Sequence, residues 1–539
     1  MDCREKEKGA GGLIDDARRL VAGAVPDLRR RAWCQATLYA GLLGAVAPAA
    51  LAGSARDQEV AIVGGGLAGL IAAYRLQQAG VLANVYEGSS RIGGRVFTDR
   101  DTFGPLQLSE RGGEAIDSIH LTVRRLVEEF GLALEARFAN DDGFAYLYEF
   151  DGERYSYADL LRSFAPLIVA ASRDEALFGP DTRYNLNTPA SRALDRLSVT
   201  DYLNLRLEGG ADSLAGRYAR SLATGTFGIE AERLSAINTI YTFSLLGLGT
   251  RHVHPNRGLL QQALAQRGTD ALAVQDEEFG PGVYQIAGGN DQLATVLAER
   301  LGDQIVTEHR LVRAATEDGR TRLHFETWSG QTEVLADRVI MALPFRVLRT
   351  LDIEQLALGP RKRLAISTLG MGTNSKLAVQ TRGKVWRRQG ASGGAETDRD
   401  FQVLWEQSAV QPGQTGVLLS FTGGDRGVAL GEGTTAEQAS NFVNDVDSLF
   451  PGVAADWNGR ALRSHWPSEP FQLGSYAGYE VGQFTTLRGI EFAREGAVHF
   501  AGEHTALAFQ GFIEGALRSG ERAANEVLAA LARTRLEAD

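Results

Sequence analysis

The clearest pattern of apolar and polar positions begins at residue 60. Val60-Ala61-Ile62-Val63 is a short apolar run that ends in glycines, as a buried parallel strand does before a tight turn. A helical pattern follows over residues 70–79, and Gly80 stands where that helix should end. Asn84-Val85-Tyr86-Glu87 has the composition of the next strand. The order strand, helix, strand predicts a βαβ unit and a parallel sheet.

The middle of the chain has a different period. Residues 116–279 carry mostly 3.6-period apolar spacing, which is typical of helices. Ser198, with Asp201 three residues later, resembles a capping box that opens a helix over residues 202–207. We therefore expect a largely helical insertion here.

Strand-type spacing returns between residues 282 and 344. The run Arg338-Val339-Ile340-Met341-Ala342-Leu343 resembles a sheet strand that leads back into the first domain. Residues 390–400 and 408–416 are rich in Gly, Ser and Gln, which predicts surface loops inside a second lobe that contains a sheet.

The composition limits the kinds of protein that the chain can be. At 539 residues it exceeds the size at which one hydrophobic core keeps growing, so we expect at least two domains. Its 44% apolar and 23% charged residues are ordinary for a soluble globular protein, and its net charge of -11 argues against a nucleic-acid partner. The two cysteines, Cys3 and Cys34, precede the first domain, so no disulfide or cysteine-bound metal is expected to support the fold.

The N-terminal residues 1–55 resemble a targeting segment. Arg29-Arg30-Arg31 precedes an uncharged run over residues 32–55, in which Ala50-Leu51-Ala52 has the small-x-small pattern of a signal-peptidase site. The arginines followed by Ala32-Trp33 resemble a twin-arginine signal, so we expect an exported or periplasmic protein with no stable membrane span after processing. The alternative is a helical extension or an uncleaved anchor, because the segment of 28 residues before the arginines is long for a signal and mixed in charge. The alternative location is the cytoplasm.

The glycine turn after the first strand is a dinucleotide fingerprint. Gly64-Gly65-Gly66-Leu67-Ala68-Gly69 matches GxGxxG, and Glu87 follows at the end of the next strand. Gly64 permits the tight turn, Gly66 lets a pyrophosphate approach, and Gly69 allows close packing of helix on strand. The Glu87 carboxylate can accept hydrogen bonds from ribose hydroxyls. This motif alone does not separate FAD from NAD.

Beyond this turn the chain resembles the flavin monoamine and polyamine oxidases. The resemblance is carried by five segments between Val60 and Leu528: the glycine turn with Arg91-Ile92-Gly93-Gly94-Arg95, then Arg111-Gly112-Gly113-Glu114, Tyr284-Gln285-Ile286-Ala287-Gly288-Gly289, Lys376 before Trp386, and the C-terminal runs Val498–Thr505 and Gln510–Ala516. It implies an FAD cofactor bound by Gly64, Gly66, Leu67, Ala68, Gly69, Glu87, Gly88, Arg91, Gly93, Gly94, Arg95, Gly112, Gly113, Glu114, Leu311, Trp466, Gly502, Glu503, Phe512 and Ile513. The FAD is expected to be noncovalent, because Ser475 stands where the animal monoamine oxidases have a cysteine.

The resemblance also implies a fold and a domain arrangement. The fold class is α/β with an α+β second lobe. A Rossmann-like FAD-binding domain would comprise residues 56–115, 280–345 and 455–539, and a substrate domain with a mixed sheet and the helical insertion would comprise residues 116–279 and 346–454. One expectation for its assembly is a homodimer.

By the same resemblance, three residues act in catalysis. Lys376 matches the lysine that holds a water at the flavin and assists reoxidation by O2. Tyr476 and Phe512 match the aromatic pair that encloses the amine, and Trp466 matches a tryptophan that packs on the flavin ring. No metal site is expected, and His252-Val253-His254 is taken as loop or pocket wall.

The substrate is expected to be an amine. Amino acid oxidases of the family have an arginine for the substrate carboxylate just after Gly113, whereas this chain has Glu114-Ala115. Asp117 matches the position of a carboxylate that binds a distal ammonium in polyamine oxidases, although Asp117 or Ser118 could instead cap a helix over residues 119–130. An L-amino acid oxidase remains the first alternative, with an arginine supplied by the insertion. A desaturase or a flavoprotein without turnover is the alternative of another class.

Overall fold

The computed structural model describes residues 58–138, 143–179, 181–246 and 283–538. The predicted signal and the His252-Val253-His254 segment therefore lie outside the described residues.

A five-stranded parallel sheet forms the first domain. Its order is β10-β2-β1-β14-β20, with β1 at Val60–Val63, β2 at Asn84–Tyr86, β10 at Ile305–Val306, β14 at Arg338–Met341 and β20 at Val498–Phe500. β1 pairs with β2 on one side and with β14 on the other. The predicted strands at residues 60, 84 and 338 are thus confirmed, and the sheet is assembled from widely separated parts of the chain.

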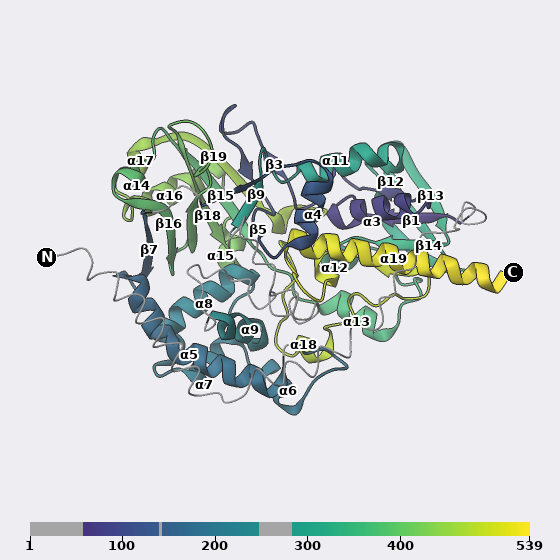
Figure 1. Ribbon diagram of the computed structural model, residues 1–539, viewed down its shortest axis with the longest axis horizontal. Helices are drawn as coiled ribbons and strands as arrows, with labels where there is room; N and C mark the ends of the chain where they lie inside the picture. The colour runs from purple at the N-terminus through teal and green to yellow at the C-terminus, as the bar shows by residue number, and fades with distance from the viewer. Residues whose placement is uncertain (1–57, 139–142, 180, 247–282, 539) are drawn as a thin grey trace.

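Two helices from opposite ends of the described chain pack together on this sheet (Figure 1). α3 (Leu67–Gln78) follows the glycine turn, and α19 (Ile513–Ala538) runs beside it. α3 begins three residues before the predicted helix, because Gly66 is already its N-cap. The contact is close: a Cβ on Gly520 would lie 2.2 Å from the Ala68 carbonyl oxygen. Arg75 also pairs with Glu521 at 2.9 Å.

A seven-stranded mixed sheet forms the second lobe. Its order is β19-β15-β18-β17-β16-β7-β8, with bounds Trp457–His465, Ser375–Thr381, Gly416–Thr422, Val403–Glu406, Ala391–Thr397, Ala145–Phe150 and Glu153–Tyr155. β19 pairs with β15, so the sheet extends past the boundary predicted at residue 455.

The predicted surface loop at residues 390–400 is wrong, because residues 391–397 form β16, a largely buried strand. Its glycines reflect close packing rather than exposure. A Cβ on Gly394 would lie 2.4 Å from the Tyr146 ring, and one on Gly393 would lie 2.7 Å from the Trp386 indole nitrogen. Residues 408–415 do form the connection between β17 and β18, although Ser408 is buried.

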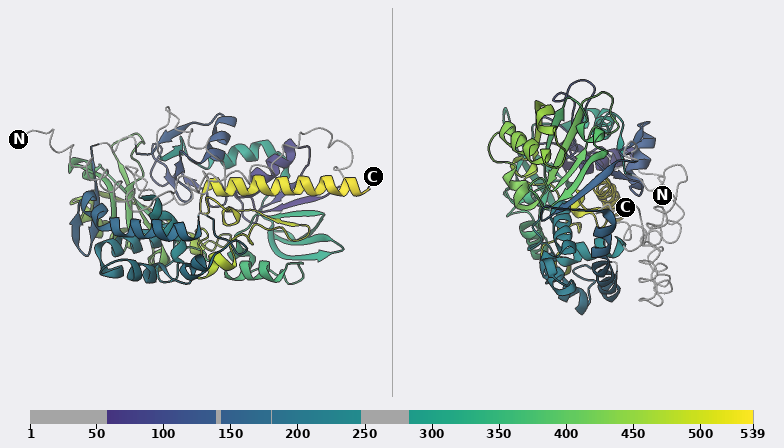
Figure 2. Two further views of the ribbon diagram at one scale, coloured as in Figure 1. Left: turned by 60° about the horizontal axis from the view of Figure 1, so that its bottom comes forward. Right: turned by 90° about the vertical axis from the view of Figure 1, so that its left-hand side faces the viewer.

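The helical insertion lies beneath this sheet in Figure 1. It contains α5 (Tyr157–Phe178), α6 (Pro189–Asp195), α7 (Val199–Arg206), α8 (Leu214–Phe227) and α9 (Ala236–Leu246). The capping box of Ser198 and Asp201 is confirmed at the start of α7. The two lobes occupy opposite ends of an elongated molecule (Figure 2).

The described residues contain further strands and helices. The strands are β3 (Thr98–Asp99), β4 (Ser109–Glu110), β5 (Ile116–Asp117), β6 (Leu134–Ala136), β9 (Val283–Ile286), β11 (Arg310–Glu317), β12 (Arg320–Thr327) and β13 (Gly330–Ala336). The helices are α4 (Leu121–Glu129), α11 (Gln292–Leu301), α12 (Phe345–Leu348), α13 (Pro360–Thr368), α14 (Val385–Arg388), α15 (Gly424–Ala429), α16 (Thr435–Asp447), α17 (Val453–Asp456) and α18 (Gln483–Thr486), with 3-10 turns η2 (Gly210–Asp212), η4 (Gly302–Gln304), η5 (Trp466–Ser468) and η6 (Glu503–Thr505). No helix within the described ranges is long and apolar enough to cross a membrane.

Candidate active site

A cavity of about 1200 Å³ runs from the parallel sheet into the second lobe. Its wall includes nearly all of the residues predicted for the site. They are Gly64, Gly66, Leu67, Ala68, Glu87, Gly88, Gly93, Gly94, Arg95, Gly112, Gly113, Glu114, Asp117, Leu311, Lys376, Trp466, Tyr476, Gly502, Glu503, Phe512 and Ile513. Segments more than 400 residues apart in the sequence therefore meet at one site.

The glycine turn leaves room for a diphosphate. Gly64 has φ of +109°, and a Cβ on Gly69 would lie 2.0 Å from the Gly64 carbonyl oxygen, so Gly69 serves packing beneath the turn rather than the cavity wall. A Cβ on Gly66 would meet only the Gly94 Cα, at 3.9 Å. Gly66 opens α3, whose N-terminal amides favour an anion. The open approach over Gly66 and Gly94 fits the diphosphate of a dinucleotide.

Glu87 stabilises the same turn. One of its carboxylate oxygens accepts a hydrogen bond from the Gly65 amide at 2.7 Å, and the other accepts from the Ser89 amide and hydroxyl at 2.8 Å. The carboxylate still borders the cavity, and a carboxylate has lone pairs for further donors. Its placement at the end of β2 is consistent with ribose recognition.

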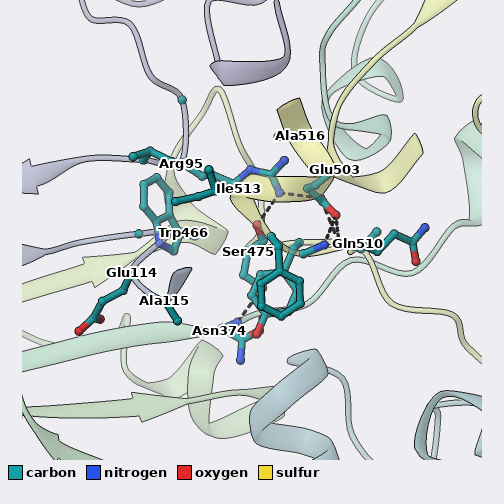
Figure 3. Close-up of a pocket in the computed structure, with 18 of the residues that line it drawn as sticks. Arg95, Glu114, Ala115, Asn374, Trp466, Ser475, Glu503, Gln510, Ile513 and Ala516 are labelled. Atoms are coloured by element: carbon teal, nitrogen blue, oxygen red, sulfur yellow. Dashed lines mark hydrogen bonds and ion pairs between the residues drawn. The ribbon is translucent and has the colours of Figure 1, made fainter. Parts of the chain in front are cut away.

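Arg95 and Glu503 hold the centre of the site together (Figure 3). The Arg95 guanidinium pairs with Glu503 at 3.0 Å and also donates to the Ser475 carbonyl oxygen. Glu503 accepts further hydrogen bonds from the Ala477 and Gly511 amides, at 3.2 and 2.8 Å. The Glu503 side chain therefore positions the two segments that carry Tyr476 and Phe512.

Of the predicted cofactor residues, Gly69 and Arg91 do not line this cavity. The Arg91 guanidinium lies over the Phe97 ring, 4.5 Å from the centroid, and lines a separate small cavity with Arg111 and Trp466. Burial lowers the pKa of Arg91.

Trp466 and the start of α19 border the site closely. The Trp466 indole donates to the Arg111 carbonyl oxygen at 3.2 Å, and a Cβ on Gly112 would lie 3.0 Å from the same ring. A Cβ on Gly113 would lie 3.1 Å from Ile513, the first residue of α19. The absence of a Cβ at Gly112 and Gly113 therefore lets Trp466 and the α19 N-terminus pack closely against this stretch of backbone, which borders the cavity.

Lys376 lies in a fully bonded ion cluster. Its ammonium pairs with the Glu114 carboxylate at 2.5 Å and donates to the Glu110 and Gly112 carbonyl oxygens, both at 2.9 Å. An ammonium has three N–H donors, so the predicted role of holding a water finds no free donor in this arrangement. Arg137 pairs with the other oxygen of Glu114, which also accepts from the Trp405 indole at 3.1 Å.

The cluster fixes the charges of two carboxyl groups. Burial alone would raise the pKa of Glu114, but the charges of Arg137 and Lys376 outweigh it and hold the pKa below its ordinary value. Glu110, by contrast, has a pKa raised to about 8, because burial and the nearby Glu114 charge outweigh its hydrogen bonds. Two cations share one carboxylate, so a net positive charge remains beside Gly112.

Tyr476 and Phe512 both line the cavity. The Tyr476 hydroxyl donates to the Thr226 carbonyl oxygen in α8, which attaches the ring to the helical insertion. Burial, together with the Glu503 charge, raises the pKa of Tyr476. Phe512 lies 5.2 Å from the His120 ring. The predicted pair is thus held from two different sides of the cavity.

Asp117 faces the cavity, but it does not cap α4. Its carboxylate lies 3.6 Å from the His120 imidazole, and His120 is the N-cap residue. The backbone amides of the first turn of α4 bind the Glu514 carboxylate of α19 instead, at 2.9 Å from Thr122 and 3.0 Å from Val123. The helix-capping alternative for Asp117 and Ser118 is therefore wrong.

Several charged residues at this cavity were missed in the sequence, among them Arg137 and Glu396 of its wall and Glu110, whose carbonyl oxygen binds Lys376. These three lie in strands or at their ends, where single charged residues usually face solvent. No local motif distinguishes them, because their partners come from distant segments: Lys376 and Glu114 are 262 positions apart.

These features define a dinucleotide-dependent oxidoreductase with a substrate cavity between two lobes. The residues fit FAD, since the cavity continues from the glycine turn past Arg95 to Trp466 and Gly112, far enough for a flavin as well as an adenine nucleotide.

The chain belongs to the flavin containing amine oxidoreductase family, whose model matches residues 67–528. Members of this family bind FAD and act on CH–NH2 groups. The chain is similar to the L-amino-acid oxidase of Naja atra, with 24% identity over 484 residues, covering 88% of each chain. Among solved structures it is similar to a putrescine oxidase bound to putrescine, with 22% identity, a TM-score of 0.72 and coverage of 88% and 99%. It is also similar to the cyclohexylamine oxidase of Brevibacterium oxydans, with 21% identity, a TM-score of 0.72 and coverage of 89% and 100%.

Proposed function

We propose that this protein is an oxidase with noncovalent FAD that oxidises a primary amine or polyamine. The carbon next to the amine nitrogen loses a hydride, the resulting imine hydrolyses to a carbonyl compound, and O2 is reduced to H2O2. Bound FAD supplies the ring that accepts the hydride. We also propose that the twin-arginine-like segment directs export of the protein. For its assembly we propose a homodimer, which a measurement of the mass in solution would test.

The residues of the chain have separate tasks in this reaction. Tyr476 and Phe512 enclose the amine and exclude water, which aligns the reacting C–H bond. Lys376 and Arg137 leave a net positive charge beside Gly112, which stabilises the negative charge that develops as oxygen is reduced.

The pairing of Arg137 with Glu114 is the observation that favours an amine over an amino acid. A substrate carboxylate is usually bound by an arginine fork, and this guanidinium is already paired with a buried carboxylate. Arg488, the other deeply buried arginine of the wall, pairs with Asp181 at 2.6 Å. A substrate carboxylate would therefore have to compete with Glu114 or Asp181.

An L-amino acid oxidase is the second candidate. Arg137 borders the cavity, and its ion pair with Glu114 is made through one guanidinium nitrogen, Nη2. The similarity to the Naja atra enzyme also supports this candidate.

The test is anaerobic reduction of the flavin by monoamines, polyamines and L-amino acids, followed by admission of air and assay of peroxide. Reduction by amines with peroxide on reoxidation supports the proposal, and reduction by amino acids alone overturns it. Arg137→Met separates the candidates further: it should impair an amino acid by about a hundredfold or more, and an amine far less. FAD released by mild acid precipitation would support noncovalent binding.

A further inference from the structure

One row of side chains crosses the large sheet from Lys376 to the tyrosines of β7. Lys376 is paired with Phe421, Phe421 with Val403, Val403 with Glu396, and Glu396 with Tyr148. Residues paired directly across neighbouring strands project from the same face of a sheet. All five line the cavity. This row therefore forms one continuous side of the cavity.

Glu396 lies at the end of this row that is remote from the flavin site. Lys376, which contacts the Gly112 carbonyl oxygen, marks the near end. The strands β15 and β16 are separated by β18 and β17, so the two positions are roughly 14 Å apart at the usual strand spacing. Phe421 and Val403 make the intervening surface apolar.

The surroundings of Glu396 fit a cation. Tyr146 donates to its carboxylate at 3.4 Å, and the Tyr146 and Tyr148 rings are 5.2 Å apart. Tyr157 of α5 and Tyr218 of α8 also lie close to Tyr148, with ring centroids 5.9 and 6.4 Å from its own. Aromatic faces and a carboxylate together are the groups that recognise an ammonium.

No lysine, arginine or histidine of the described ranges forms an ion pair with Glu396, in contrast to Glu114 and Glu406. Burial raises its pKa to about 7, even though the Tyr218 and Tyr146 hydroxyls favour the charged form. Glu396 is partly buried in the cavity wall, and a carboxylate withdrawn from water without a cation carries a cost that falls when a positively charged ligand enters.

We propose that Glu396 and the tyrosines around it bind a second ammonium of the substrate, so that the enzyme prefers long diamines or polyamines. This proposal rests on the proposed amine oxidase function. It gives Glu396 the task that the sequence suggested for Asp117, whose carboxylate lies beside His120.

The experiment compares diamines with n-alkylamines of equal length on the FAD-loaded enzyme, from 1,4-diaminobutane to 1,12-diaminododecane. For the wild type, kcat/KM for the diamines should rise with length until the second ammonium reaches Glu396. Glu396→Gln should lower kcat/KM for the best diamine by about tenfold or more and leave the matched monoamine within about twofold. Glu153→Gln, which removes an exposed carboxylate from β8 of the same sheet, should change neither.

Calorimetric binding of the same diamine separates this proposal from the proposed function. If the wild type binds the diamine, Glu396→Gln does not, and no amine reduces the flavin, the oxidase function fails and the ammonium site stands. If amines are oxidised but Glu396→Gln changes diamine and monoamine equally, or changes neither, the ammonium site is refuted.

Discussion

Replacing Glu114 by glutamine should destabilise the protein more than almost any other single change of a carboxylate. The Glu114 side chain is 5% exposed and pairs with both Lys376 and Arg137. A glutamine would leave two buried cations without a counter-charge. Removing one partner of a buried ion pair costs about 3–5 kcal/mol.

A double-mutant cycle tests this account. Lys376→Met removes one cation and leaves Glu114 paired with Arg137, so its cost should be smaller, about 1–3 kcal/mol. In the double variant the glutamine no longer faces a buried ammonium. We therefore expect it to be more stable than the sum of the single changes, with a coupling energy of about 2 kcal/mol.

The assay is chemical denaturation of the FAD-loaded enzyme followed by circular dichroism. Glu128→Gln, which removes an exposed carboxylate on α4, serves as the control and should stay within about 0.5 kcal/mol of the wild type. The folded pKa of Glu114 lies below the ordinary 4.5, so the advantage of the wild type should be complete above that pH and should fall as the pH drops through the folded pKa. A cost under about 1 kcal/mol for Glu114→Gln, or strict additivity in the cycle, would refute the reasoning.

Three further predictions follow from the same geometry. Gly69→Ala places a Cβ 2.0 Å from a backbone oxygen and should prevent folding, whereas Gly66→Ala should fold, shown by circular dichroism, but retain little FAD, shown by flavin absorbance per protein. A folded Gly69→Ala protein, or a wild-type FAD content in Gly66→Ala, would contradict this. Glu110 has a folded pKa of about 8, so its contribution to stability is complete below pH 4.5 and is lost as the pH rises through 8. Glu110→Gln should therefore be more stable than the wild type at high pH, and the difference in unfolding free energy should shrink at low pH. Denaturation across pH measures this difference, and a constant difference would refute the prediction. Tyr476→Phe loses one hydrogen bond to α8 and should lower kcat/KM by about five- to tenfold. Tyr476→Ala loses the ring and should lower kcat/KM by about a hundredfold or more. Similar losses in the two variants would show that the face of the ring does not determine kcat/KM.

Local patterns predicted the parts of this molecule that depend on neighbouring residues. The strand before Gly64, the helix after it and the capping box at Ser198 each depend on a few consecutive positions, and all were found in the structure. β16 was missed because glycine and serine usually indicate exposed loops. Its glycines are required by the Tyr146 and Trp386 rings, which come from other segments.

The charged part of the site could not be read in the same way. The sequence identified Lys376 and Glu114 as site residues but not that they pair, since the partner of a single Glu or Lys depends on strand register and on contacts across hundreds of positions. The row that joins Lys376 to Glu396 exists only once β15, β18, β17 and β16 are paired in order. Prediction of those pairings needs the fold itself.

The packing of α19 on α3 has a consequence for how the protein is made. α3 is translated long before α19, the helix that covers it, and before the Glu514 carboxylate that binds the start of α4. Completion of this domain must therefore wait until α19 has been synthesised, because contacts this distant in sequence cannot form earlier. Until then the apolar face of α3 has no cover from α19, which makes the nascent chain a substrate for chaperones and leaves FAD capture as a late event.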